Sequence, residues 1–286
     1  MGISADHIRK LHKYEIRILV ALERLMKRYQ WVPLDILTRT VRLSESEVSY
    51  RLGRLMEWGM VRYDIVPYEG YTLVFSGFDT IALISLTRKG TVNALGCMIG
   101  EGKEALVYEG LGLGPLALKF HHVGQRSFQS ARVTREYLPE QGHCPWIFAS
   151  GYSAEREYQA LQRLLPDVSV PLPIDHNRHV VVMELISGAT LNRCRLSDPG
   201  KALEEILDNT RRSYEKGIIH SDLSEFNVMV DEKEKIYLID WPQWIDPAHP
   251  NAEEILSRDV DNILRYFERK YRISYPLQDA LVLVTG

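Results

Sequence analysis

The feature that most constrains the fold is a pair of motifs in the last quarter of the chain. The first reads His-Ser-Asp-Leu-Ser-Glu-Phe-Asn over residues 220–227, so that Asn227 follows Asp222 by five positions. The second is an apolar run, Ile-Tyr-Leu-Ile, that ends at Asp240. This pattern predicts a loop among short strands that presents carboxylate and amide oxygens, the ligands that Mg²⁺ prefers.

The spacing of these motifs is that of a kinase catalytic loop followed by its metal-binding aspartate. Phosphoryl transfer needs a carboxylate that orients the attacking hydroxyl, and Asp222 is the candidate for this role. Asn227 and Asp240 are the candidate metal ligands, because a bound Mg²⁺ neutralises charge on the ATP phosphates. A single residue of this kind more often caps a turn, but all three in register favour a catalytic site.

A lysine at the end of an apolar strand fits the same chemistry. Residues 116–120 read Leu-Ala-Leu-Lys-Phe, and Lys119 matches the strand lysine that contacts the α- and β-phosphates. A glycine-containing segment precedes it, in which backbone N–H groups can approach phosphate oxygens. Its candidate ATP-binding residues are Gly100, Glu101, Gly102, Lys103, Glu104, Ala105 and Val107. A Walker A loop is excluded, because Glu104 stands where that motif requires Ser or Thr.

Two further parts of an ATP site are expected. The lysine needs a carboxylate partner on a helix, and Glu157 is the first candidate, with Glu155 as the alternative. An apolar strand that breaks into a glycine-containing turn predicts the segment that contacts adenine. Its candidate residues are Met183, Glu184 and Ile186.

The first 90 residues have the element order of a winged helix-turn-helix. Apolar periodicity predicts helices at residues 7–29 and 34–41, and a third helix whose Ser44 and Glu47 fit a capping box. Two strands at residues 61–66 and 71–75 and a helix at residues 78–89 complete the pattern. A loop is expected over residues 123–150, and helices are expected over residues 199–216, 252–270 and 276–284.

The charge balance of this region predicts a polyanionic partner. Residues 1–90 carry 14 Lys and Arg against 10 Asp and Glu, whereas the remainder carries 21 against 28. Because residues 1–90 are basic and the remainder is acidic, we expect the first segment to contact a phosphate backbone or an acidic protein. The candidate nucleic-acid contacts are Arg51, Arg54 and Arg62.

Cysteine usage and hydropathy predict a cytoplasmic protein without a membrane span. The three cysteines are widely separated, so that neither a cysteine-based zinc site nor a disulfide framework is supported. No apolar run approaches the roughly 18 residues that a transmembrane helix needs.

The motifs, taken in order, resemble the RIO family of atypical protein kinases. Residues 220–227 are similar to the family's H-[ST]-D-L-[SN]-E-[FY]-N, and residues 239–243 resemble its I-D-[FW]-P-Q in place of D-F-G. The 46 residues after Asp240 are too few for the large helical lobe of ordinary protein kinases. The glycine-containing loop and the winged helix resemble the second RIO subfamily, and the short chain fits an archaeal member.

This resemblance implies an α+β fold, with a winged helix at residues 1–90 and a trimmed two-lobed kinase domain at residues 91–286. The N-lobe would cover about residues 91–183 and the C-lobe about residues 184–286. The implied activity is that of a Ser/Thr protein kinase or ATPase that uses ATP and Mg²⁺, with Mn²⁺ as a substitute. The implied role is maturation of the small ribosomal subunit, with ribosomal RNA or a pre-small-subunit particle as partner.

The same resemblance implies two sites of phosphorylation. The aspartate at the position of Asp240 accepts phosphate in the family, and carboxylate nucleophiles of this kind are chemically reasonable. Ser127 or Ser130, in the expected loop, would be sites of autophosphorylation.

Two other functions stay open at this point. Small-molecule kinases share the catalytic pattern, but only 36 residues separate Glu184 from His220, which leaves little room for their helical substrate pocket. A nucleic-acid-binding protein switched by nucleotide would use the winged helix as its working part. Release of phosphate from ATP without an added acceptor separates these functions from the RIO-type activity.

Overall fold

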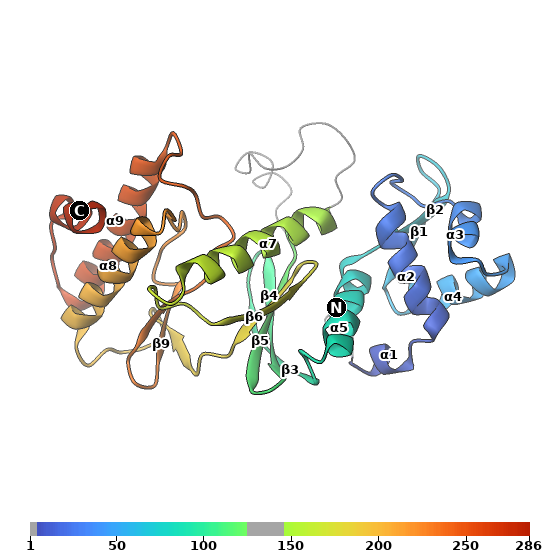
Figure 1. The fold of residues 1–286 in the computed structure, drawn as a ribbon, viewed down its shortest axis with the longest axis horizontal. Coiled ribbons are helices and arrows are strands. Elements are labelled where there is room, and N and C mark those ends of the chain that lie inside the picture. The colour runs from blue at the N-terminus through green and yellow to red at the C-terminus, as the bar shows by residue number, and fades with distance from the viewer. Residues whose placement is uncertain (1–4, 125–145) are drawn as a thin grey trace. The chain divides into compact units, whose positions relative to one another are not determined.

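The computed structural model describes residues 5–124 and 146–286 (Figure 1). The chain divides into two compact units. The first unit contains Met1–Ala154 and His176–Val180, and the second contains Glu155–Asp175 and Val181–Gly286. Both units combine helices with antiparallel strands, as the predicted α+β class requires.

The first unit begins with the predicted order of a winged helix. Its elements are α1 (Ala5–Lys10), α2 (Lys13–Leu25), α3 (Leu34–Val41), α4 (Glu45–Glu57), β1 (Val61–Asp64), β2 (Gly70–Leu73) and α5 (Phe75–Lys89). The expected single helix at residues 7–29 is wrong, because a capping box interrupts it. His12 accepts a hydrogen bond from the Tyr14 amide, and Glu15 accepts one from the His12 amide, so that α2 starts anew.

The predicted cap of α4 forms on one side only. The Ser44 hydroxyl accepts a hydrogen bond from the Glu47 amide at 3.3 Å. The Glu47 carboxylate accepts from Arg51 Nε at 2.8 Å, one turn further along the helix. Ser44 therefore caps the helix as predicted, whereas Glu47 belongs to an ion pair.

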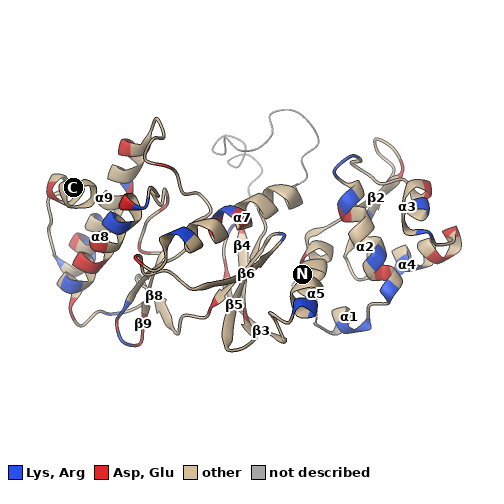
Figure 2. Ribbon diagram, viewed as in Figure 1, with Lys and Arg blue, Asp and Glu red and all other residues tan. Residues whose placement is uncertain are grey.

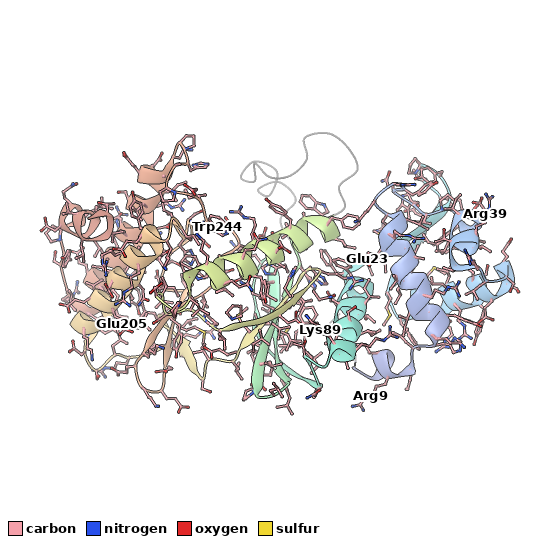
Figure 3. The ribbon with its side chains drawn as sticks, in the orientation of Figure 1. Arg9, Glu23, Arg39, Lys89, Glu205 and Trp244 are labelled. Atoms are coloured by element: carbon pink, nitrogen blue, oxygen red, sulfur yellow. The ribbon has the colours of Figure 1, made fainter. Side chains whose placement is uncertain are left out.

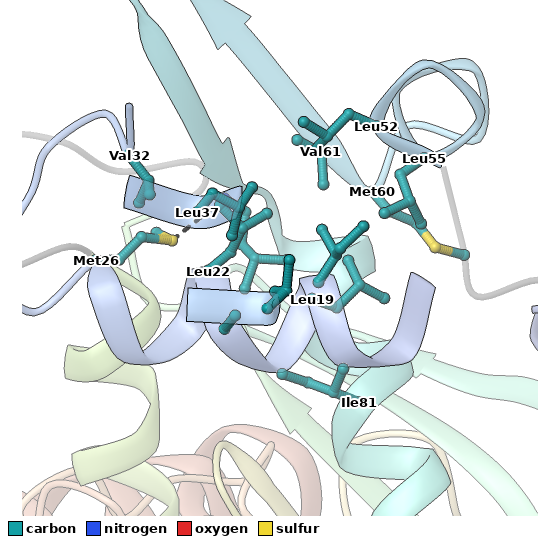
Figure 4. Close-up of a cluster of buried hydrophobic side chains, with 14 of the residues drawn as sticks. Leu19, Leu22, Met26, Val32, Leu37, Leu52, Leu55, Met60, Val61 and Ile81 are labelled. Atoms are coloured by element: carbon teal, nitrogen blue, oxygen red, sulfur yellow. Dashed lines mark hydrogen bonds between the residues drawn. The ribbon is translucent and has the colours of Figure 1, made fainter. Parts of the chain in front are cut away.

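The core of the winged helix contains apolar side chains from six of its elements, α2 to α5 and both strands (Figure 4). Its fully buried members include Leu19, Leu22, Val32, Leu37, Leu52 and Leu55. Each such side chain contributes roughly 1.5–3 kcal/mol when it leaves water. Met26 joins this core to the wing, because its sulfur accepts a hydrogen bond from the Leu73 amide at 3.2 Å.

An antiparallel meander follows α5 and carries the predicted phosphate-binding segment. Its strands are β3 (Ala94–Glu101), β4 (Ala105–Leu111) and β5 (Pro115–His121). Gly100 pairs with Val107, and Val107 pairs with Lys119. This register places Gly100, Val107 and Lys119 on one line across the sheet.

The second unit contains a small antiparallel sheet in the order β10-β9-β8 and a group of packed helices. The strands are β8 (Gly188–Thr190), β9 (Val228–Asp231) and β10 (Ile236–Leu238), and the helices are α8 (Pro199–Glu215), α9 (Ala252–Tyr271) and α10 (Leu277–Thr285). Helices were predicted over nearly the same three ranges.

Three elements contain residues of both units: α7 (Trp146–Leu164), β6 (Pro173–Asn177) and β7 (Val180–Glu184). The expected loop at residues 123–150 is wrong at its end, because α7 begins at Trp146. In the parts of the chain that the structure describes, no helix combines the length and apolar character needed to cross a membrane.

A buried carboxylate joins α2 to α4 in the winged helix. Glu15 is fully buried and lies 3.0 Å from Arg54 Nη1 and 3.4 Å from Arg51 Nη1. Two of the three candidate nucleic-acid contacts therefore pair with an acidic side chain of the core. Arg62 differs, since its side chain is 62% exposed, lies over the Trp31 ring and has only a longer, exposed ion pair with Asp64, at 3.9 Å. Both α2 and α4 carry charges of both signs (Figure 2).

Replacing Glu15 with alanine should lower the free energy of unfolding by about 3 kcal/mol, because it leaves two partly buried arginines without their shared partner. The Asp35→Ala variant is the matched control, because its ion pair with Arg39 is exposed and should contribute less than about 1 kcal/mol. Urea denaturation followed by circular dichroism measures both. Equal stability of the two variants would contradict a structural role for Glu15.

Candidate active site

Asp222 and Asn227 lie together in a loop between α8 and β9. Asn227 Nδ2 donates to the Asp222 carbonyl oxygen at 2.7 Å and to Asp222 Oδ2 at 3.2 Å. With the amide nitrogen engaged in this way, the amide oxygen is the atom that Asn227 can offer to a cation. The spacing of five residues thus produces one local unit with a carboxylate and an amide.

Asp240 is close enough to change the acidity of Asp222. Burial, followed by the negative charge of Asp240, holds the pKa of Asp222 above its ordinary value. The backbone at Asp240 is left-handed, with φ of 69°, which is uncommon for a residue with a side chain. The Ile239 amide donates to the Asn227 carbonyl at 3.0 Å and so ties the two motifs together.

A pair of residues from α9 holds the backbone of the catalytic loop at Ser221. Asp259 Oδ2 accepts from the Ser221 amide at 2.7 Å, and Arg258 Nη2 donates to the Ser221 carbonyl at 2.6 Å. Ser221 also has a left-handed backbone, with φ of 69°. Such a conformation costs on the order of 1–3 kcal/mol and persists only where surrounding contacts enforce it.

Neither Asp259 nor Arg258 was identified from the sequence. Asp259 is 1% exposed, and its burial raises its pKa. The position of Asp259 in the sequence could have indicated its burial. It lies at helical spacing between Leu256 and Ile263, on the apolar face of α9. A carboxylate on such a face needs a specific partner.

His220 joins the catalytic loop to the strand that leads to Asp240. Its Nε2–H donates to the Ile239 carbonyl at 2.9 Å, while Nδ1 accepts from the Asp222 amide at 3.3 Å. These two bonds are consistent with one neutral tautomer. The ring lies against Trp241, with centroids 4.3 Å apart. His220 is therefore a positioning residue for both aspartates.

Helix α7 holds the segment that follows Asp240. Glu157 is 1% exposed, and its Oε1 accepts from the Trp241 amide at 3.2 Å. Arg156 donates to the Pro242 and Trp244 carbonyls, and the Trp244 indole donates back to the Arg156 carbonyl (Trp244 is labelled in Figure 3). Glu155, the alternative carboxylate, is less buried and accepts from Gln159.

The candidate phosphate-binding residues belong to the first unit. Lys119 is 8% exposed within β5. The turn between β3 and β4 is closed by a bond from the Gly102 amide to the Ala105 carbonyl at 2.8 Å. The remaining candidates lie around this turn, with Glu101 and Lys103 exposed and Gly100, Glu104 and Val107 half-buried.

The candidate adenine-binding segment lies at the end of β7. Met183 is buried, whereas Glu184 and Ile186 are half-buried. A hollow in the second unit is lined by residues 184–187 and, from the other side, by Asp231, Lys233 and Tyr237 among others. Ser127 and Ser130 lie outside the described residues.

Two family models match the chain and together cover most of it. The model of the RIO domain matches residues 103–280, and the model of the Rio2 N-terminal region matches residues 8–89. The fold and the grouped Asp222, Asn227 and Asp240 are those of a protein-kinase-like phosphotransferase. The chain belongs to the RIO family of serine/threonine protein kinases, in its Rio2 branch.

Individual relatives agree with this assignment. The RIO-type serine/threonine-protein kinase Rio2 of Methanocaldococcus jannaschii is 39% identical over 87% of this chain and 93% of its own length. The rio2 kinase of Dictyostelium discoideum is 31% identical over 95% of this chain, which spans 53% of that longer protein. The Rio2 kinase–ADP/Mg²⁺–phosphoaspartate complex of Chaetomium thermophilum has a TM-score of 0.85 at 28% identity, and covers 99% of this chain and 89% of that one.

Removing the Glu157 side chain should reduce phosphate transfer by about tenfold to a hundredfold. The Trp241 amide would lose its acceptor, and Asp240 would no longer be held in one position. Glu155→Ala, two residues away on the same helix, is the control and should retain wild-type turnover. Release of phosphate from ATP measures both variants, and circular dichroism checks their folding. Equal losses of turnover in both variants would contradict a specific role for the Glu157 carboxylate.

Proposed function

We propose that this chain transfers the γ-phosphoryl group of ATP, with Asp222 as the residue that orients and deprotonates the attacking hydroxyl. One observation carries the proposal: Asp222 is hydrogen-bonded to Asn227 and lies within electrostatic reach of Asp240. The raised pKa of Asp222 makes its carboxylate a stronger proton acceptor than an ordinary aspartate.

The donor set fits a magnesium ion. Asp240 offers carboxylate oxygens, and Asn227 offers its amide oxygen because its nitrogen is bound to Asp222. Hard oxygen ligands of this kind suit Mg²⁺, and Mn²⁺ as a substitute. When bound, the ion would neutralise charge on the phosphates. Lys119 and residues 100–107 would bind the nucleotide phosphates, and Met183, Glu184 and Ile186 the adenine.

Asp240 is also our candidate for the first phosphate acceptor. One of its carboxylate oxygens would form a bond to the γ-phosphorus as the bond to the β-phosphate oxygen breaks, which releases ADP. Water would then cleave the acyl phosphate and restore the aspartate, completing an ATPase cycle. The solved Chaetomium thermophilum structure, a phosphoaspartate complex, supports this proposal by analogy.

Asp222→Asn should lower transfer to Ser or Thr by about 10²–10⁴-fold, because the amide cannot accept the hydroxyl proton. Incubation with γ-labelled ATP and Mg²⁺, followed by mapping of the label, measures this directly. Asp246→Asn is the control, since Asp246 is an exposed carboxylate in the segment after Asp240. Full activity in both Asp222→Asn and Asp240→Asn would overturn the site. Base-labile label that disappears in Asp240→Asn would identify the aspartyl phosphate.

We propose further that the winged helix binds ribosomal RNA or a pre-small-subunit particle and that the protein acts in the cytoplasm during maturation of that subunit. The support is the basic balance of residues 1–90 and the exposed position of Arg62 on the wing. Nothing comparable favours Arg51 or Arg54, whose charges already pair with Glu15. Reversing the charge of Arg51 or Arg54 would therefore destabilise the fold, and a loss of binding in such a variant would not identify a contact.

Arg62→Gln should weaken binding to ribosomal RNA and reduce the slope of log affinity against log salt by about 1, as loss of one phosphate contact requires. Arg39→Gln is the control, because Arg39 is exposed on α3 and already paired with Asp35. Fluorescence anisotropy over a series of salt concentrations measures both. An unchanged slope in Arg62→Gln would remove this wing residue from the interface.

A further inference from the structure

Three side chains that can bind a metal meet in the buried interior of the first unit, and none of them is assigned to phosphate transfer. They are Asp79 on α5, His122 just after β5, and His179 in the turn between β6 and β7. His179 is fully buried, and the other two are each 4% exposed. Each side chain offers one potential ligand atom, and these three atoms lie within 4.8 Å of one another. Among the described residues, this is the group of potential metal ligands that meets that distance.

The three side chains converge on one carboxylate oxygen. Asp79 Oδ1 accepts from His122 Nε2 at 2.8 Å and from His179 Nε2 at 2.6 Å. Aromatic rings surround the group: His179 stacks on Phe78 at 4.3 Å, and His122 lies 4.4 Å from Phe75. Water is therefore largely excluded, and the charge of Asp79 depends on these two imidazoles.

A divalent cation could replace the two hydrogen bonds with little movement. Zinc binds imidazole nitrogen and carboxylate oxygen at about 2.0–2.2 Å, so that tetrahedral ligands lie about 3.3 Å apart. The two N···O separations, 2.8 and 2.6 Å, would have to open by roughly half an ångström, a distance that small side-chain rotations can supply. Two neutral imidazoles and one carboxylate form a donor set that suits Zn²⁺ better than Mg²⁺.

One atom of the group is unexplained by hydrogen bonding alone. His179 Nδ1 is buried and has no hydrogen-bond partner. With Nε2–H bonded to Asp79, Nδ1 carries an unused lone pair, whereas binding of a metal at Nε2 would move the proton to Nδ1.

We propose that Asp79, His122 and His179 form a structural site for one Zn²⁺ ion. The site would join α5, the last helix of the segment matched by the Rio2 N-terminal model, to the end of β5. His122 follows Lys119 by three residues, and the His121 amide donates to the His179 carbonyl at 2.9 Å. Zinc would therefore reinforce the strand end that carries the candidate phosphate-binding lysine.

The test uses the full-length, tag-free chain, first treated with a chelator and then titrated with Co²⁺ as a spectroscopic substitute for Zn²⁺. We expect one Co²⁺ per chain, with visible d–d absorption typical of tetrahedral nitrogen and oxygen ligands, and displacement by one equivalent of Zn²⁺. Asp240→Asn should leave this band unchanged, because it alters the separate catalytic site.

Matched variants locate the ion. His179→Gln and Asp79→Asn should lose the band and weaken binding at least tenfold. His176→Gln should keep both, because His176 lies on the same hairpin but bonds to the Arg178 carbonyl. Retention of wild-type binding in His179→Gln would overturn the proposal, as would absence of Co²⁺ uptake by the wild-type chain.

A measurement on the wild-type protein covers the case in which these variants do not fold. X-ray absorption spectra of the zinc-loaded chain report how many imidazole rings coordinate the ion. Two imidazoles in a nitrogen and oxygen shell would support the site. Fewer than two, or sulfur ligands from Cys97 or Cys194, would overturn it and leave the group as a hydrogen-bonded Asp–His–His network.

Discussion

The bond between the Asp259 carboxylate and the Ser221 amide is the interaction on which the catalytic loop depends. It is buried, and it holds a left-handed residue immediately before Asp222. Because Arg258 binds the carbonyl of the same residue, the peptide units on both sides of Ser221 are held by α9. The direction of the Asp222 side chain and its bonds to Asn227 follow from this constraint. A loop held in this way needs no rearrangement at the moment of reaction, which is where electrostatic preorganisation has its effect.

The position of Asp240 depends on a different helix. The Trp241 amide bonds to Glu157, 84 residues earlier in the chain, and Arg156 binds two carbonyls of the same segment. His220 links this segment to the catalytic loop through the Ile239 carbonyl. The two aspartates are thus oriented by α9 and α7, with His220 between them. Burial raises the pKa of Asp222 most, and the negative charge of Asp240, which these contacts hold nearby, raises it further.

The winged helix shows what a count of charged residues can predict and what it cannot. The basic excess of residues 1–90 is a property of the sequence, but it does not say which cations face solvent. Arg51 and Arg54 lie against the buried Glu15, whereas Arg62 extends over Trp31 and stays exposed. An arginine that compensates a buried carboxylate cannot give up that contact to a phosphate without a cost in stability. The polyanion contact that we propose for this unit must therefore use its exposed cations.

Local patterns in the sequence determined the helices at residues 34–41 and 199–216, the wing strands, and the motifs that contain Asp222, Asn227 and Asp240. These features depend on spacing within a few residues, so periodicity and motif reading suffice. The break at His12 and the start of α7 at Trp146 were missed, because a histidine cap and the entry to a long helix leave weak local signals. Only the tertiary structure decided which buried charges meet: Glu15 with Arg51 across 36 positions, Ser221 with Asp259 across 38, and Asp79 with His179 across 100. A buried charge selects its partner by position in space, and no pattern along the chain encodes that distance.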